Sequence, residues 1–134
     1  SLAMKTAQPN LLRLLGKIEW KKGNLDQAIK YFSDAIEFDP TDAENYILCS
    51  DLYIQRREVE KALGILEKGI KMNSDDWKLY QHAGKIYWDI KNYSKSEEYF
   101  QIAQQLNPEN IKIKKQLDTL RAMNIIHSKQ EARI

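Results

Sequence analysis

The side chains that most often carry out chemistry are few in this sequence and widely separated. The two histidines, His82 and His127, have no second His or Cys near them at the spacing of a metal site. No glycine-rich phosphate loop occurs. The carboxylate pairs at residues 75–76 and 97–98 fall at a predicted helix start or on a polar helix face, where solvated charge is the ordinary role. We therefore expect no catalytic residues, no metal ligands and no cofactor, and the sequence does not predict an enzyme.

Cys49 is the only cysteine of the chain. An intrachain disulfide is therefore impossible, and a reducing compartment is the simpler inference. A free cysteine usually behaves as a small buried hydrophobe, so we interpret Cys49 as a structural thiol. A reactive thiol is the alternative.

The bulk composition excludes several classes of function. Among 134 residues, 21 basic and 19 acidic side chains leave a net charge of +2, which provides no general field for nucleic acid or an anionic membrane. No apolar run reaches the roughly 18 residues of a membrane span, and the first residues lack the apolar core of a secretory signal. We expect an intracellular, cytoplasmic protein that neither inserts into membranes nor binds nucleic acid.

The sequence pattern of the chain repeats at an interval of 34 residues. Each interval holds two amphipathic helical patterns, and small or large apolar side chains return at the same places in it. A unit of this size cannot bury its apolar face alone, so the period indicates a stacked helical repeat. The recurring sets are Leu25, Val59 and Tyr93; Phe32, Leu66 and Phe100; and Trp20, Ile54 and Trp88.

The residues that recur at fixed positions in the three units resemble the signature of the tetratricopeptide repeat. The first copy has Leu15, Gly16, Trp20, Ala28, Phe32 and Pro40; the second keeps Tyr46, Tyr53, Ala62 and Leu66; the third has Tyr80, Gly84, Tyr87, Phe100 and Pro108. The resemblance implies an all-α fold, a right-handed superhelix of three helix-turn-helix repeats with a C-terminal solvating helix. It also implies a scaffold that binds a peptide or a protein surface and does no chemistry.

The repeats predict the organisation of the whole chain. We expect an expression scar and N-terminal segment at 1–8, repeats at 9–42, 43–76 and 77–110, and a capping helix with a tail at 111–134. The first helix is expected to begin at residue 9, with Pro9 in its first turn. Thr41 and Glu44 are spaced as a capping box for the third helix. The polar residues Lys114 and Asp118 replace apolar ones, which favours an array that ends with this helix.

In the family, the first helix of each repeat lines a concave groove. The residues that this register places in the groove combine an apolar centre with basic flanks. Trp20 and Trp88 are either binding anchors or packing residues, and the lysines Lys17 and Lys85 are either ligand contacts or a solvated face. The predicted groove residues are Arg13, Lys17, Trp20, Ile47, Leu48, Asp51, Ile54, Lys78, Gln81, His82, Lys85 and Trp88.

One subgroup of the family clamps the acidic C-terminal tails of heat-shock chaperones. Its pattern requires Lys, Asn, Asn, Lys and Arg at Arg13, Lys17, Leu48, Lys78 and His82 of this chain. Leu48 cannot donate the amide hydrogen bond that the second Asn gives to a terminal carboxylate. We therefore do not expect a standard carboxylate clamp, although Arg13, Lys17 and Lys78 could hold an acidic peptide less specifically.

The first helix carries a second feature, an apolar edge at Leu11, Leu15 and Ile18. These residues belong to the set that packs against a preceding repeat. Residues 4–8, a second copy of the chain or repeats upstream of this sequence are the alternatives for covering it. Two functions follow. The leading hypothesis is an adaptor that binds a partner peptide in the groove, and the alternative is a scaffold that contacts partners or itself through this edge.

Overall fold

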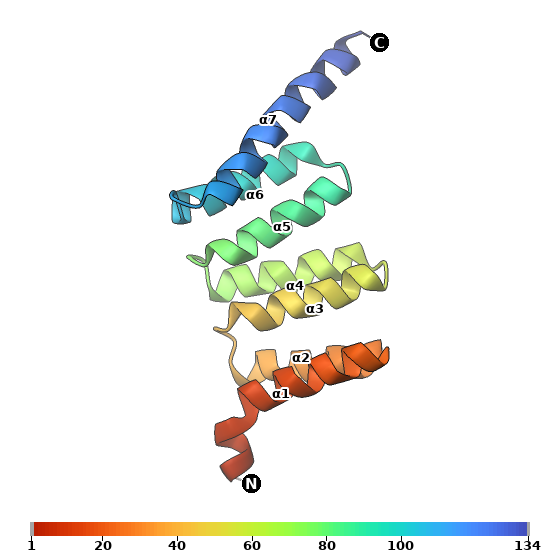
Figure 1. The fold of residues 1–134 in the computed structure, drawn as a ribbon, viewed down its shortest axis with the longest axis vertical. Helices are drawn as coiled ribbons and strands as arrows, with labels where there is room; N and C mark the ends of the chain where they lie inside the picture. The colour runs from red at the N-terminus through yellow and green to blue at the C-terminus, as the bar shows by residue number, and fades with distance from the viewer. Residues whose placement is uncertain (1, 134) are drawn as a thin grey trace. The chain divides into compact units, whose positions relative to one another are not determined.

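Seven helices and no strand make up residues 2–133, the part of the chain that the computed structural model describes; side chains are described from residue 10 (Figure 1). The predicted all-α helical-repeat fold is confirmed. Within these residues no helix has the length and apolar character to cross a membrane. The helices are α1 (Leu2–Lys22), α2 (Leu25–Phe38), α3 (Ala43–Gln55), α4 (Val59–Met72), α5 (Trp77–Asp89), α6 (Tyr93–Leu106) and α7 (Ile111–Ala132).

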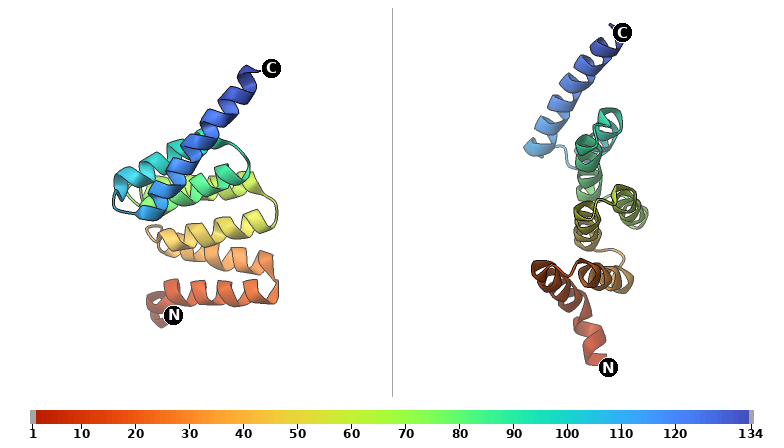
Figure 2. Two further views of the ribbon diagram at one scale, coloured as in Figure 1. Left: turned by 45° about the horizontal axis from the view of Figure 1, so that its top comes forward. Right: turned by 90° about the vertical axis from the view of Figure 1, so that its right-hand side faces the viewer.

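The helices fall into two compact units, residues 1–74 and 75–134. In the first unit α1 packs on α2, α2 on α3 and α3 on α4, so that two helical hairpins follow one another (Figure 2). In the second unit α5 packs on α6 and α6 on α7. Each unit thus has a first helix and a second helix in alternation, as the 34-residue period predicts.

The turn inside each hairpin has the same backbone conformation in all three repeats. Gly23, Arg57 and Lys91 have φ values of 86°, 62° and 65°, in the left-handed region. The next residue then donates its N–H to a carbonyl five residues back, as in the Asn24 N to Glu19 O bond of 2.9 Å. This is the hydrogen bond of a Schellman motif, so the C-terminal carbonyls of the first helix are satisfied by the turn itself.

The first helix of each following repeat begins with a side-chain cap. Asp42, Asp76 and Asn110 accept hydrogen bonds from backbone N–H groups of the first turn at 3.0–3.1 Å, and they are 34 residues apart. The capping box predicted at Thr41 and Glu44 was therefore wrong. The Thr41 hydroxyl instead donates to Asp39 Oδ1 at 2.6 Å, because the next residue, Asp42, is a better cap than threonine.

Each hairpin closes around one large ring and one glycine. A methyl group on Gly16 would lie 2.7 Å from Phe32 Cε1, and one on Gly84 would lie 2.8 Å from Phe100 Cδ2. Both rings are fully buried. The signature glycines are thus needed because the two helices approach too closely for a Cβ atom.

The first helix begins earlier than expected. α1 starts at Leu2, so Pro9 lies inside the helix and not in its first turn. The first turns of α1 run in a different direction from the rest of the helix (Figures 1 and 2). A proline lacks the N–H that continues the helical ladder and kinks a helix, which accounts for the bend.

The last helix confirms the predicted division of its faces. Ile113, Leu117 and Leu120 are fully buried in the second unit, where α7 packs on α6. Lys114 and Asp118 are exposed. The polar face of α7 is therefore compatible with solvent, as a capping helix requires.

Candidate functional site

In the first unit, side-chain hydrogen bonds bring α1 and α3 together along one face. Trp20 Nε1 donates to Gln55 Oε1 at 2.8 Å, and Arg13 Nε donates to Asn45 Oδ1 at 3.0 Å. Trp20 and Arg13 are almost two helical turns apart, so the two bonds fix the helices at two levels. The structure thus joins two predicted groove residues of α1, Arg13 and Trp20, to α3, and we call the side of α1 and α3 that carries these bonds the α1–α3 face.

Arg13 is not available for a ligand in the way that the sequence suggests. Its guanidinium forms an ion pair with the Asp42 carboxylate, and its Nε–H is held by Asn45. The side chains of Arg13 and Asp42 are 22% and 29% exposed, and Asn45 is fully buried. The charge of Arg13 is thus neutralised by the carboxylate that caps the start of α3.

Lys17 lies one turn after Arg13 and has a different environment. Its side chain is exposed, and its ammonium has no ion pair within residues 10–133. Leu14, between the two, is 55% exposed. The α1 side of the face thus offers a solvated cation next to an exposed apolar side chain.

The α3 side of the face is mainly apolar. Ile47, Leu48 and Ile54 are each half-buried, so part of each side chain remains in contact with water. Asp51 is half-buried on the same helix. The predicted groove residues of α3 are thus mainly apolar and partly exposed.

The two tryptophans are packed against the core of their own hairpins. The Trp20 ring meets Phe32, and the Trp88 ring meets Phe100, both edge to face. Both tryptophans are half-buried. The packing interpretation therefore accounts for the buried part of each tryptophan, and the rest of each side chain is exposed.

In the second unit, α5 carries the remaining predicted residues. Gln81 Nε2 donates to Gln116 Oε1 of α7 at 3.0 Å, which joins α5 to α7 as Trp20 and Arg13 join α1 to α3. Lys78 is exposed, and His82, Lys85 and Trp88 are half-buried. The second unit thus has its own basic and aromatic surface on α5.

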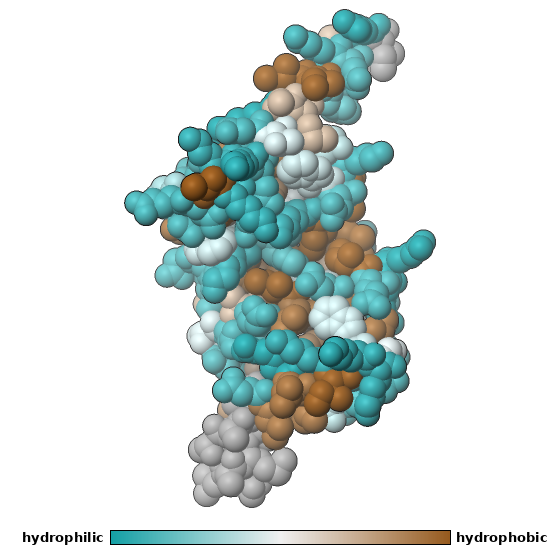
Figure 3. Space-filling view, in the orientation of Figure 1, coloured by the Kyte–Doolittle hydropathy of each residue, from teal (hydrophilic) through white to brown (hydrophobic). Residues whose placement is uncertain are grey.

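The apolar edge of α1 is exposed to solvent. Leu11 and Ile18 are 39% and 41% exposed, and Leu15 is half-buried. At the same positions of α7, Ile113, Leu117 and Leu120 are fully covered. Apolar side chains gather on this part of α1 in the space-filling view (Figure 3).

Cys49 has the environment of a structural thiol. It is fully buried, and this burial raises the pKa of the Cys49 thiol to about 11. The thiolate fraction at neutral pH is therefore very small, which makes the group a poor nucleophile. Within residues 2–133 no group of three His, Cys, Asp or Glu side chains is placed to hold a metal ion.

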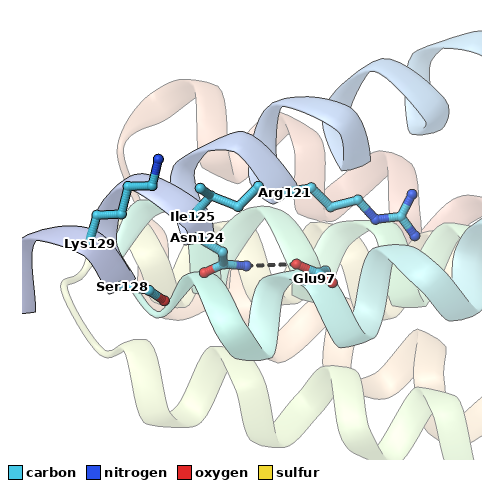
Figure 4. Close-up of a pocket in the computed structure, with 6 residues that line it drawn as sticks. All are labelled: Glu97, Arg121, Asn124, Ile125, Ser128 and Lys129. Carbon is cyan, nitrogen blue, oxygen red and sulfur yellow. Dashed lines mark hydrogen bonds between the residues drawn. The ribbon is translucent and has the colours of Figure 1, made fainter. Parts of the chain in front are cut away.

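The structure also has a surface depression that the sequence did not predict. It lies between α6 and α7 and has a volume of about 540 Å³ (Figure 4). Asn124 Nδ2 donates to Glu97 Oε1 at 2.7 Å and to the Tyr93 carbonyl at 3.3 Å, so these polar groups tie α7 to α6. Arg121, Ile125 and Lys129 follow at intervals of four residues on α7, and this spacing is the only signal that the sequence offered.

Comparison with known proteins gives one consistent family. Two family models, both described as tetratricopeptide repeat, match residues 19–85 and 78–110. Protein bimA of Emericella nidulans is 31% identical over 85 residues, which are 63% of this chain and 10% of that protein. The Hsp70-Hsp90 organising protein of Plasmodium falciparum is 28% identical over 119 residues, which are 89% of this chain and 47% of that protein. The chain thus spans between a tenth and about half of these relatives.

Solved structures share the fold. The first TPR of Spaghetti (RPAP3), bound to the HSP90 peptide SRMEEVD, has a TM-score of 0.73 at 16% identity and covers 88% of this chain and 94% of that chain. The Yersinia enterocolitica type III secretion chaperone SycD, in complex with a peptide of the translocator YopD, has a TM-score of 0.72 at 15% identity, with coverages of 86% and 93%. At these identities the likeness concerns the arrangement of helices.

Proposed function

Because this chain belongs to the tetratricopeptide-repeat family, we propose that it is a protein-interaction module that binds a segment of a partner protein on its first-helix faces, as an adaptor or co-chaperone-like subunit. In the first unit the surface is the α1–α3 face. In the second unit, Lys85 and Trp88 of α5 provide the same kinds of side chain. The structural relatives RPAP3 and SycD each hold a peptide, which supports this class of function.

The observation that carries the proposal is the state of Lys17. Its ammonium is solvated and has no ion pair within residues 10–133, while Leu14 beside it is 55% exposed. A single exposed leucine is ordinary on a protein surface, but here Leu14 lies next to a lysine that no ion pair within residues 10–133 holds in place. Both side chains are suited to a ligand with an apolar residue and a carboxylate.

A pull-down from lysate with two matched charge variants tests this function. Lys17→Glu with Lys85→Glu reverses two charges on the first-helix faces, and Lys30→Glu with Lys71→Glu makes the same change of charge on α2 and α4. All four lysines are on helices of the repeats, and Lys30 and Lys71 are exposed. We expect partners retained by the wild type and by the control pair to be lost with the first pair.

Retention of the same partners by both variants would contradict the proposal. Both variants should first be shown to unfold at the same urea concentration as the wild type, since none of the four lysines has an ion pair within residues 10–133. A purified acidic peptide, SRMEEVD, is a defined first probe for the same surfaces.

The second candidate function is a scaffold that contacts a partner or itself through the apolar edge. It is favoured by the exposure of Leu11 and Ile18, 39% and 41%. Leu11→Asp places a charge in this edge without altering Lys17. If the edge is the true contact, the variant loses partners that Lys17→Glu with Lys85→Glu retains, or its solution mass falls from a multiple of 15.7 kDa to the monomer.

A further inference from the structure

On the α1–α3 face, Asp42 forms an ion pair with Arg13 and so neutralises a cation of that face. Arg13 lies on α1, and Asp42 is the N-cap of α3, 29 residues later. Asp42 Oδ1 accepts the Glu44 N–H at 3.1 Å, while Oδ2 holds the Arg13 guanidinium. The carboxylate is therefore fixed by the helix start, and Arg13 is bound to an acid that cannot move away.

Asn45 strengthens this arrangement at a cost to the core. The same position is apolar in the first helix of the other repeats, with Leu11, Leu79 and Ile113. Asn45 is fully buried, and its Nδ2 has no hydrogen-bond partner among the described residues. An unsatisfied buried amide group destabilises a fold, so Asn45 does not improve the packing of the core. We therefore attribute its presence to the hydrogen bond that its Oδ1 accepts from Arg13 Nε.

We propose that Asp42 determines the ligand specificity of the α1–α3 face by occupying Arg13. Because Arg13 is neutralised, the part of the face around Arg13 recognises its ligand through apolar contact with Leu14. Carboxylates of the ligand bind only farther along α1, to Lys17 and Lys21, which are both exposed. The partner segment therefore carries an apolar residue, not an acid, at the Arg13 end. This inference rests on the proposed function and names the chemistry of the segment that the same face binds.

The variant Asp42→Asn tests the inference without removing the helix cap. Asparagine caps a helix about as well as aspartate, so α3 keeps its start while Arg13 loses its counter-charge. Asp34→Asn is the matched control, because it makes the same change of charge at an exposed residue of α2. Arg13→Gln with Asp42→Asn removes the released cation again.

The measurement is a titration with the acidic peptide SRMEEVD, followed by two-dimensional NMR of the backbone amides and of the arginine Nε–H groups. In the wild type we expect the Arg13 Nε–H signal to stay unchanged when peptide is added. This holds both if the peptide binds and shifts the Lys17 amide signal and if the peptide does not bind. In Asp42→Asn the Arg13 signal should move, and the affinity should rise about tenfold, the effect of one charge-assisted hydrogen bond. Asp34→Asn should behave as the wild type, and the double variant should lose the gain.

Two results would overturn the inference. One is movement of the Arg13 Nε–H signal in the wild type when peptide is added, because Arg13 would then be free to bind. The other is an Asp42→Asn protein with no gain in affinity, including the case in which neither protein binds. Failure here leaves the lysate experiment with Lys17 and Lys85 unaffected, since that experiment does not depend on Asp42.

Discussion

Trp20 meets Phe32 edge to face, with ring centroids 6.2 Å apart and ring planes at 79°. Trp88 and Phe100, two repeats later, have the same relationship at 6.5 Å and 82°. In each pair the tryptophan is on the first helix of a hairpin and the phenylalanine on the second. The tryptophans that the sequence leaves as either binding anchors or packing residues therefore do pack within their hairpins.

Trp20→Ala should lower the stability of the first unit by about 2 kcal/mol, because it removes a half-buried ring and its contact with Phe32. Trp20→Phe should cost less than about 1 kcal/mol, since an aromatic ring remains although the bond to Gln55 is lost. Urea unfolding of the two variants measures the difference. An unchanged midpoint for Trp20→Ala would show that the ring contributes nothing to the hairpin.

Two glycines should respond in opposite directions to the same change. A methyl group on Gly64 would meet no atom within 4 Å, so Gly64→Ala should stabilise α4 by about 1 kcal/mol. The methyl group of Gly16→Ala would lie 2.7 Å from Phe32 Cε1 and should destabilise the protein by about 1–3 kcal/mol. Thermal unfolding of both variants checks the signs, and equal signs would contradict this account of the hairpin packing.

The left-handed turn residues offer a third prediction. Lys91 has a φ of 65°, which costs a residue with a side chain roughly 1 kcal/mol more than glycine. Lys91→Gly should therefore raise the unfolding midpoint, as the natural Gly23 at the same turn position suggests. Lys30→Gly, inside α2, is the control and should lower the midpoint by a comparable amount. A loss of stability in both variants would refute the turn argument.

The stability of the first unit should decline at alkaline pH through Cys49. Burial raises the pKa of the Cys49 thiol from 9.0 to about 11. Between these values the unfolded chain binds fewer protons than the native one, so the free energy of unfolding falls as pH rises from about 9 to about 11. Below pH 9 the contribution is fully present.

Urea unfolding at pH 8 and at pH 10.5 measures this decline in the wild type and in Cys49→Ala. The variant should lose less stability between the two pH values, although it is less stable at both. Burial also raises the pKa of Tyr46 and of Tyr53, so a residual decline remains in the variant. Equal declines in both proteins would show that Cys49 does not titrate as inferred.

Much of the fold follows from local spacing. The interval of 34 residues and the small side chains at Gly16 and Gly84 follow from the sequence pattern alone, and the structure has them as predicted. The start of α1 and the cap of α3 were predicted less well. Helix ends depend on competition between neighbouring residues, and Asp42 is a better cap than Thr41.

For the candidate site, the sequence determined which residues share a face, because helical periodicity alone places Arg13 and Lys17 one turn apart. Only the tertiary structure decided which of the two cations is free. Asp42 and Asn45 reach Arg13 from another helix, 29 and 32 residues away, while no carboxylate among residues 10–133 pairs with Lys17. Periodicity carries no information on which charges meet between helices, since that depends on the distance and angle at which the helices pack.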